Sequence, residues 1–262
     1  MLRVIYAEAR KLRRPTLALS TTAIVAGLSV LFTSLVYLRI NSGHNTRRGE
    51  FISAATLSQA SGIAYGFKLV SAFLGLVALC IFASQTAQEY TYGTLRNLLV
   101  RQPARMKILG GKFIVMASFA IFMVATTAVI TVAASYLLAP GAKVTTSLWG
   151  TSAGLSLLGH TFVNVLLSTI GFGLFGMILG LLLRSPISAI SIGVIWNLVL
   201  ENILSAALSG SAKWLPGQNI SNIGEGGSVD ISYMHSIGIS AAYLLVGFGI
   251  VATLFKKRDV AN

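Results

Sequence analysis

Six long apolar segments divide the chain, and shorter stretches between them hold most of the charged residues. Each apolar segment has about 20 residues or more, which is the length that an α-helix needs to cross a hydrocarbon core of about 30 Å. The pattern predicts an all-α integral membrane protein with six transmembrane helices, at residues 17–38, 63–83, 113–139, 161–183, 187–208 and 236–255. The connecting stretches are short, so we expect one membrane domain over residues 1–262.

The residues before the first apolar segment have the pattern of an amphipathic helix. Apolar side chains recur at a spacing of three or four residues, at Leu2, Ile5, Tyr6, Ala9 and Leu12. Arginines occupy the other side, at Arg3, Arg10, Arg13 and Arg14, and Pro15 interrupts the helix. We expect residues 1–15 to form an interfacial helix, held by apolar burial and by attraction to anionic membrane lipid. The alternative is a basic flank that only sets the topology.

Composition agrees with a membrane protein. Only 10% of the residues are charged and 55% are hydrophobic, with a mean hydropathy of +0.78, whereas soluble domains carry about 25% charged residues. The net charge of +13 does not indicate a nucleic-acid partner, because the basic residues cluster between the apolar segments. With both termini inside, the inner stretches hold 14 Lys and Arg residues and the outer ones hold six. This bias predicts that both termini are cytoplasmic.

The stretch between the second and third apolar segments has the most informative sequence. Gly93 predicts a turn, and Thr94 is suited to cap a short helix. Leu95, Leu98 and Leu99 would share one side of that helix. Exposed leucines on a charged loop need a cover, so we expect a docking surface for a cytoplasmic partner. The alternative is a solvated inner loop with the usual positive charge.

Three segments together resemble a known family. The first is a run through the same loop, with Glu89, Tyr92, Gly93, Thr94, Leu95, Arg96, Leu99, Arg101, Pro103, Arg105, Leu109 and Lys112. The second is residues 214–219, with Leu215 and Pro216, and the third is the ending from Leu254 to Asp259. They resemble the coupling loop, the Leu-Pro segment before the last span and the Phe-x-x-Arg-Asp tail of bacterial ABC type-2 transporter permeases. With the six-span layout, the resemblance covers essentially the whole chain.

The resemblance implies a permease subunit of an ATP-driven exporter in the bacterial cell membrane, with a peptide, drug or lipid-like cargo. The N-terminal helix would be the elbow helix, and residues 210–235 would form short re-entrant helices at the outer mouth, with Leu215 and Pro216. Two permease chains, identical or paralogous, would pair around the translocation path. A coupling helix would dock on a separate cytoplasmic ATPase dimer through Glu89, Tyr92, Gly93, Thr94, Leu95, Arg96, Leu98, Leu99 and Arg101.

The chain has no nucleotide-binding motif of its own. The run from Gly110 to Phe113 lacks the earlier glycine of a Walker A motif, since position 106 is Met, and it lacks the Ser or Thr after Lys112. We therefore expect no catalytic residues and no cofactor in this chain, with ATP and Mg bound by the partner subunit. Two alternatives stay open: an ion-coupled secondary transporter and a membrane scaffold without transport.

Two polar pairs fall within the apolar segments. Asn197 and Glu201 are one turn apart in the fifth segment, and charged residues there usually face a cavity or a partner. They would line the translocation path or the dimer seam, or else Glu201 would lie among the outer headgroups. His160 and Asn164 are also four residues apart, and we expect helix packing rather than a metal site or a proton relay. No Cys/His cluster has the spacing of a metal site.

Glycines mark one side of the fourth apolar segment. Gly176 and Gly180 form a Gly-x-x-x-Gly pattern, which lets helix backbones approach closely in membranes. We expect this pattern to report packing within the chain rather than a dimer interface.

Overall fold

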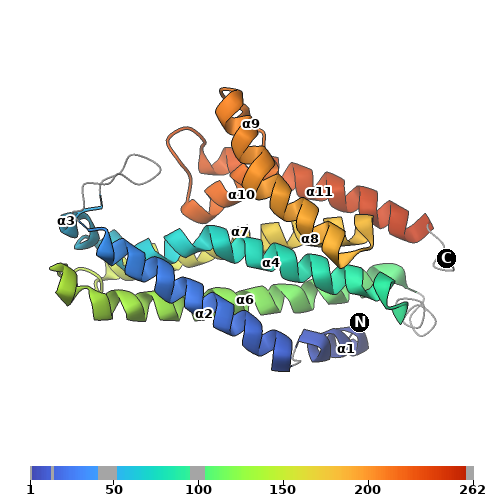
Figure 1. Ribbon diagram of the computed structural model, residues 1–262, viewed down its shortest axis with the longest axis horizontal. Coiled ribbons are helices and arrows are strands. Elements are labelled where there is room, and N and C mark those ends of the chain that lie inside the picture. Colours follow the sequence, from blue (N-terminus) through green and yellow to red (C-terminus); the bar gives the residue numbers. More distant parts are fainter. Residues whose placement is uncertain (1, 13–14, 41–51, 95–103, 258–262) are drawn as a thin grey trace.

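The computed structural model describes residues 2–12, 15–40, 52–94 and 104–257, and regular structure in these residues is entirely helical (Figure 1). The long helices are α2 (Pro15–Leu38), α4 (Tyr65–Thr91), α6 (Arg105–Leu138), α7 (Ser152–Leu183) and α11 (Tyr233–Lys257). The shorter elements are α1 (Leu2–Leu12), α3 (Ala54–Leu57), η1 (Ala60–Ala64), η2 (Pro140–Ala142), α8 (Pro186–Ile195), η3 (Trp196–Leu200), α9 (Glu201–Ala207), η4 (Ser211–Lys213) and α10 (Pro216–Glu225).

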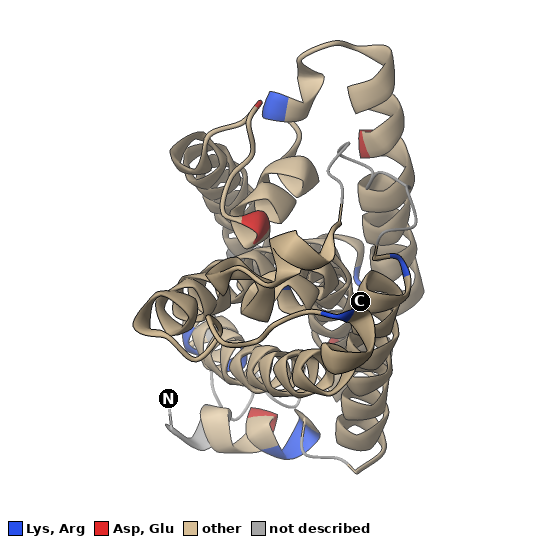
Figure 2. Cartoon of the chain, turned by 90° about the vertical axis from the view of Figure 1, so that its left-hand side faces the viewer, with Lys and Arg blue, Asp and Glu red and all other residues tan. Residues whose placement is uncertain are grey.

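Six helical segments of the described residues are long and apolar enough to cross a membrane, which confirms the predicted number. They are α2, η1 with α4, α6, α7, α8 through α9, and α11. Figure 2 shows few charged positions along them. Both α1 and the last turns of α11 lie toward one end of the bundle, which we call the α1 end; the opposite end, with α3, is the α3 end (Figure 1).

Three helices extend beyond the apolar segments that predicted them. The helix α4 continues past Ala83 to Thr91, and α6 begins at Arg105 rather than at residue 113. Similarly, α7 begins at Ser152, nine residues before residue 161. Thr151 caps α7 by accepting a hydrogen bond from the Gly154 N–H. Hydropathy reports where a helix is apolar, whereas caps and polar partners decide where it ends.

The centre of the bundle is the pair α4 and α7. Within its most apolar stretch, α7 is 67% buried, against 11% for α11. The helices α2 and α6 lie on one side of this pair, and α8, α10 and α11 lie on the other (Figure 1). The pair therefore forms the part of the chain against which the other helices are placed.

Glycines on α7 set the separation of α4 and α7. A Cβ atom built on Gly176 would lie 2.2 Å from the backbone oxygen of Leu79, and one on Gly180 would lie 2.7 Å from that of Ala83. A real Cβ atom does not approach a backbone oxygen so closely, so only glycine allows this contact. The prediction that the Gly-x-x-x-Gly pattern packs within the chain is confirmed.

A single methyl group on this contact tests how far the fold depends on it. We expect Gly176→Ala to lower the thermal stability of the detergent-solubilised protein, because the backbone oxygen of Leu79 has no room to move aside. Gly159→Ala is the matched control on the same helix, since a Cβ there meets nothing within 4 Å and alanine is favoured over glycine within a helix by about 0.5–1 kcal/mol. Equal melting temperatures for the two variants would contradict the proposed role of Gly176.

Candidate functional site

The short helix α1 packs against the bundle at the α1 end. Leu12 is buried, and Ile5 and Ala9 pack beside it against a core shared by residues of α4, α6, α7 and α11. Tyr6, which the sequence pattern placed on the same apolar side, is 74% exposed. The packed side also carries two charged residues, Glu8 and Lys11, so it is less apolar than the pattern predicted.

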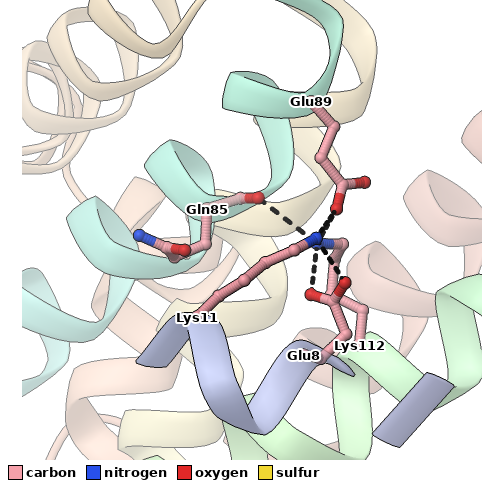
Figure 3. Close-up of polar contacts among 5 residues, drawn as sticks. All are labelled: Glu8, Lys11, Gln85, Glu89 and Lys112. Carbon is pink, nitrogen blue, oxygen red and sulfur yellow. Dashed lines mark hydrogen bonds and ion pairs between the residues drawn. The ribbon is translucent and has the colours of Figure 1, made fainter. Parts of the chain in front are cut away.

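Four charged side chains, from α1, α4 and α6, meet where α1 packs against the bundle (Figure 3). Lys112 of α6 donates to Glu8 Oε2 of α1 at 2.7 Å, to Glu89 Oε1 of α4 at 2.8 Å and to the backbone oxygen of Gln85 at 3.3 Å. These three bonds use all three protons of the ammonium group. The whole residue is only 1% exposed, so its charge is compensated within the chain.

Lys11 bridges the same two carboxylates from the rim of the cluster. Its Nζ lies 2.6 Å from Glu8 Oε1 and 2.5 Å from Glu89 Oε1. Two lysines and two glutamates make a neutral set, which we call the charge cluster: Glu8, Lys11, Glu89 and Lys112. Removing one member would leave a charge uncompensated, and the four ion pairs together join α1, α4 and α6.

Glu8 and Lys11 of the cluster hold their charges over a wide pH range. Burial raises the pKa of Glu8, but the ammonium groups of Lys112 and Lys11 lower it by more, so it lies below its ordinary value of 4.5. Burial lowers the pKa of Lys11, but the carboxylates of Glu89 and Glu8 raise it by more, to above its ordinary value of 10.5. The stabilisation from Glu8 is complete above pH 4.5 and is lost as pH falls through its lowered pKa. That from Lys11 is complete below pH 10.5 and is lost as pH rises through its raised pKa.

The structure corrects the predicted position of Glu89. The residue belongs to the last turn of α4 rather than to the following loop, and its carboxylate is buried in the charge cluster. Tyr92, Gly93 and Thr94 come next and are exposed. Gly93 has φ of 64°, a left-handed conformation that glycine adopts readily, so the predicted turn is confirmed. The other predicted coupling residues lie outside the described residues: Leu95, Arg96, Leu98, Leu99 and Arg101.

Sequence reasoning missed three members of the cluster. The amphipathic pattern predicts an interfacial helix for the segment with Glu8 and Lys11, and the resemblance includes Lys112 only as part of the coupling-loop run. One signal was present, because the chain has only seven acidic residues and two of them, Glu8 and Glu89, lie in otherwise basic stretches. A lone acid among basic residues at a span end indicates an internal ion pair.

A second polar site lies where the fifth span meets α10. The carboxylate of Glu201 is fully buried and accepts three hydrogen bonds: from Trp196 Nε1 at 2.7 Å, from the Gly217 N–H at 2.8 Å and from the Gln218 N–H at 2.7 Å. Gly217 and Gln218 are in the first turn of α10. A carboxylate stabilises the positive end of a helix dipole and satisfies its free N–H groups. Glu201 therefore caps a neighbouring helix within its own chain.

This site brings together residues for which the sequence predicts two different places, the outer mouth and the translocation path or dimer seam. Leu215 is the residue before α10 and Pro216 is the first residue in it, so both lie beside the carboxylate of Glu201. Asn197 also reaches this place, since its Nδ2 would be 2.3 Å from a Cβ built on Gly217. The side chains of Asn197 and Glu201 thus both lie next to Gly217 at the start of α10.

Of the remaining polar pair, Asn164 has a packing role. Asn164 accepts a hydrogen bond at 2.8 Å from the hydroxyl of Tyr233, at the start of α11, and His160 is exposed. No group of three or more His, Cys, Asp or Glu residues that could hold a metal is present in the part of the chain that the structure describes.

Neutralising the buried lysine tests the charge cluster. We expect Lys112→Met to lower the free energy of unfolding by about 3–5 kcal/mol, because two carboxylates then share one lysine. Adding Glu8→Gln to Lys112→Met restores neutrality and recovers part of that loss. Unfolding in detergent of the two single variants and the double variant gives the coupling energy, expected to be about 0.5–3 kcal/mol.

The control for this experiment is Lys107→Met, since Lys107 is exposed on the same helix. Exposed substitutions usually change stability by no more than about 0.5 kcal/mol. If Lys107→Met destabilised the protein as much as Lys112→Met, the buried charge cluster would not be the cause.

The comparison with known proteins gives a family for the chain. No curated protein matches it. A family model described as a protein of unknown function (DUF2705) matches residues 28–261. The matched region holds Glu89, Lys112 and Glu201, and it covers every element from α3 to α11, whereas α1 precedes it. The match covers well over half of the sequence, and the chain therefore belongs to the DUF2705 family.

Proposed function

We propose that this chain is the membrane-spanning permease subunit of an ATP-driven exporter, with both termini in the cytoplasm of a bacterial cell. In this proposal a separate cytoplasmic ATPase dimer binds ATP and Mg, and a second permease chain completes the translocation path. The cargo is a peptide, a drug-like molecule or a lipid-like molecule. The sequence resemblance motivates the proposal, and the six apolar helices are compatible with it.

The charge cluster is the observation that carries the proposal furthest. Glu89 is in the last turn of α4, and Lys112 is seven residues after the first residue of α6. The stretch with the coupling motif connects these two helices. A force applied to that stretch acts on the two helix ends that the cluster joins. Because Glu8 and Lys11 add α1 to the same cluster, the three helices respond as one unit.

The proposed mechanism follows from this linkage. Closure of the ATPase dimer around ATP pushes on the docked stretch after Gly93. The ion pairs between Glu89 and Lys112 pass the displacement to α4 and α6 together, and α4 passes it to α7 through their close backbone contact. In this view Glu89 positions the docking stretch and does not touch the ATPase.

An ion-coupled transporter is the alternative, and the geometry of Glu201 weighs against it. A coupling carboxylate has to exchange ions or protons with a water-filled path. The carboxylate of Glu201 is instead occupied by an indole and two backbone N–H groups of the same chain.

Purification from native membranes tests the proposed function. We expect the tagged chain to retain an ATPase subunit in stoichiometric amount, measured as Mg-dependent ATP hydrolysis in the eluate. The double variant Leu98→Asp and Leu99→Asp should lose most of that activity, because two charges then interrupt the apolar side of the predicted docking helix.

The matched control is Thr151→Asp, which adds a negative charge at the α3 end. Thr151 caps α7, and Asp is an equally good cap, so this variant should retain the ATPase. A chain that elutes without any ATPase, and that moves solute along an ion gradient in proteoliposomes, would overturn the proposal in favour of the ion-coupled alternative.

A further inference from the structure

The fifth span is interrupted by a wide turn. It consists of α8, the π-helical turn η3 and α9, and the N–H of Glu201 donates to the carbonyl of Trp196, five residues back. An α-helix pairs residues four apart, so the wider turn changes which side chains share a face. Here it aligns Trp196 with Glu201, whose side chains are joined by a 2.7 Å hydrogen bond.

A side chain supports the widened turn. The amide of Asn202 donates to the backbone oxygen of Asn197 at 3.3 Å and to that of Leu198 at 3.0 Å. A side chain that bonds into the backbone ladder is a recognised cause of a local bend in a helix. The fifth span therefore has a defined point at which its backbone hydrogen-bond pattern changes.

The first turn of α10 has no cap besides Glu201. Leu215, at the cap position, makes no side-chain cap bond, and Pro216 has no N–H. The next two N–H groups, of Gly217 and Gln218, both donate to Glu201. Without that carboxylate, two donors at the start of a largely buried helix would lose their partners, which is unfavourable where water cannot replace them.

Close approach of the two segments requires a glycine. A Cβ atom on Gly217 would lie 2.3 Å from Asn197 Nδ2 and 2.7 Å from Glu201 Oε2. An alanine at this position therefore displaces the Asn197 amide and the Glu201 carboxylate from the start of α10, even though the carboxylate is kept.

The two segments differ in how they are attached to the rest of the chain. On α10, Ile220 faces Gly171 and Gly224 faces Ser168, both on α7, so α10 is fixed to the central pair. On α9, Ile203 is 58% exposed, and the main neighbours of the helix are η3 and η4. Figure 1 shows α9 projecting beyond the bundle.

The segment before the turn is also fixed. Ala189 of α8 is fully buried, and a Cβ on Gly193 would lie 2.8 Å from a methyl group of Leu79 on α4. Thus α8 is packed on one side of the turn and α9 is loosely packed on the other, so the turn separates a fixed segment from one with freedom to move.

We propose that Glu201 is a clasp that holds α9 against α10, and that the π-helical turn Trp196–Leu200 is the hinge on which α9 swings away when the clasp opens. The swing opens the α3 end of the chain between the fifth span and α10. The proposal rests on the contacts of Glu201, and it does not require that the chain be an exporter permease.

Distances between spin labels on the full-length protein in lipid nanodiscs test the clasp. In a Cys80→Ser background, the pair Ile203→Cys and Leu155→Cys reports α9 against α7. The pair Val129→Cys and Leu155→Cys reports α6 against α7 as a check on folding. The three labelled positions, on α6, α7 and α9, are well exposed, and Cys80 on α4 is half-buried. We expect one narrow distribution for each pair with Glu201 present.

Two substitutions open the clasp by different routes. Glu201→Ala removes the acceptor, and Gly217→Ala keeps the acceptor but blocks the approach. We expect both to replace the narrow α9–α7 distance with a broad one shifted by several ångström, since α9 is about 10 Å long, and to leave the α6–α7 distance unchanged. Asp230→Asn, which removes an exposed carboxylate from the segment after α10, is the control and should change neither distance.

The outcomes separate clearly. An unchanged α9–α7 distance in both Glu201→Ala and Gly217→Ala, with the α6–α7 distance intact, overturns the clasp. If Glu201→Ala changes the α6–α7 distance, the variant is misfolded and Glu201→Gln replaces it, because Gln keeps one acceptor oxygen. Glu201→Gln should shift the α9–α7 distance in part of the molecules. An unchanged α9–α7 distance in Glu201→Gln overturns the proposal. The measurement involves no ATPase, so its result is independent of the test of the proposed function.

Discussion

Charges that this chain buries must be compensated within the chain, because lipid supplies no hydrogen-bonding partner. The structure meets this constraint in two ways. At the α1 end, Lys112 is balanced by the carboxylates of Glu8 and Glu89. In the fifth span, Glu201 is balanced by neutral donors, which are an indole and the first N–H groups of a helix. In both places the compensation joins segments that are far apart in sequence.

Local pattern was sufficient to predict the features that depend on neighbouring residues. The six apolar helices follow from hydropathy, the turn after α4 follows from Gly93, and internal packing at Gly176 and Gly180 follows from their spacing. These features arise from the solvent and from backbone sterics, which act on a few consecutive residues at a time.

The charge cluster could not be predicted in that way. Its contacts join residues 78 and 104 positions apart, and they depend on how α1 lies against α4 and α6. The hinge is a similar case, because hydropathy treats residues 187–208 as one helix and gives no sign of a π-helical turn. For Glu201, the sequence indicated that a partner was needed, but not that the partner would be the start of α10.

Between the two polar sites lies a close backbone contact. Gly176 and Gly180 bring the backbones of α4 and α7 into contact, where no flexible side chain is available to absorb a displacement. Packed interiors transmit strain for this reason. Since α4 joins the charge cluster at one end and α10 rests on α7 toward the other, the central pair is a rigid connection between the two sites.

The two sites differ in how they would respond to such a displacement. In the charge cluster each lysine contacts both carboxylates, so the loss of one ion pair leaves every member with another partner. In the fifth span one carboxylate accepts from all three donors. Among the described residues, no second acceptor bonds to the N–H groups of Gly217 and Gln218. Moving Glu201 therefore breaks the three bonds together. Redundant pairing favours a junction that stays intact as it moves, whereas a single shared acceptor favours two discrete positions, closed and open.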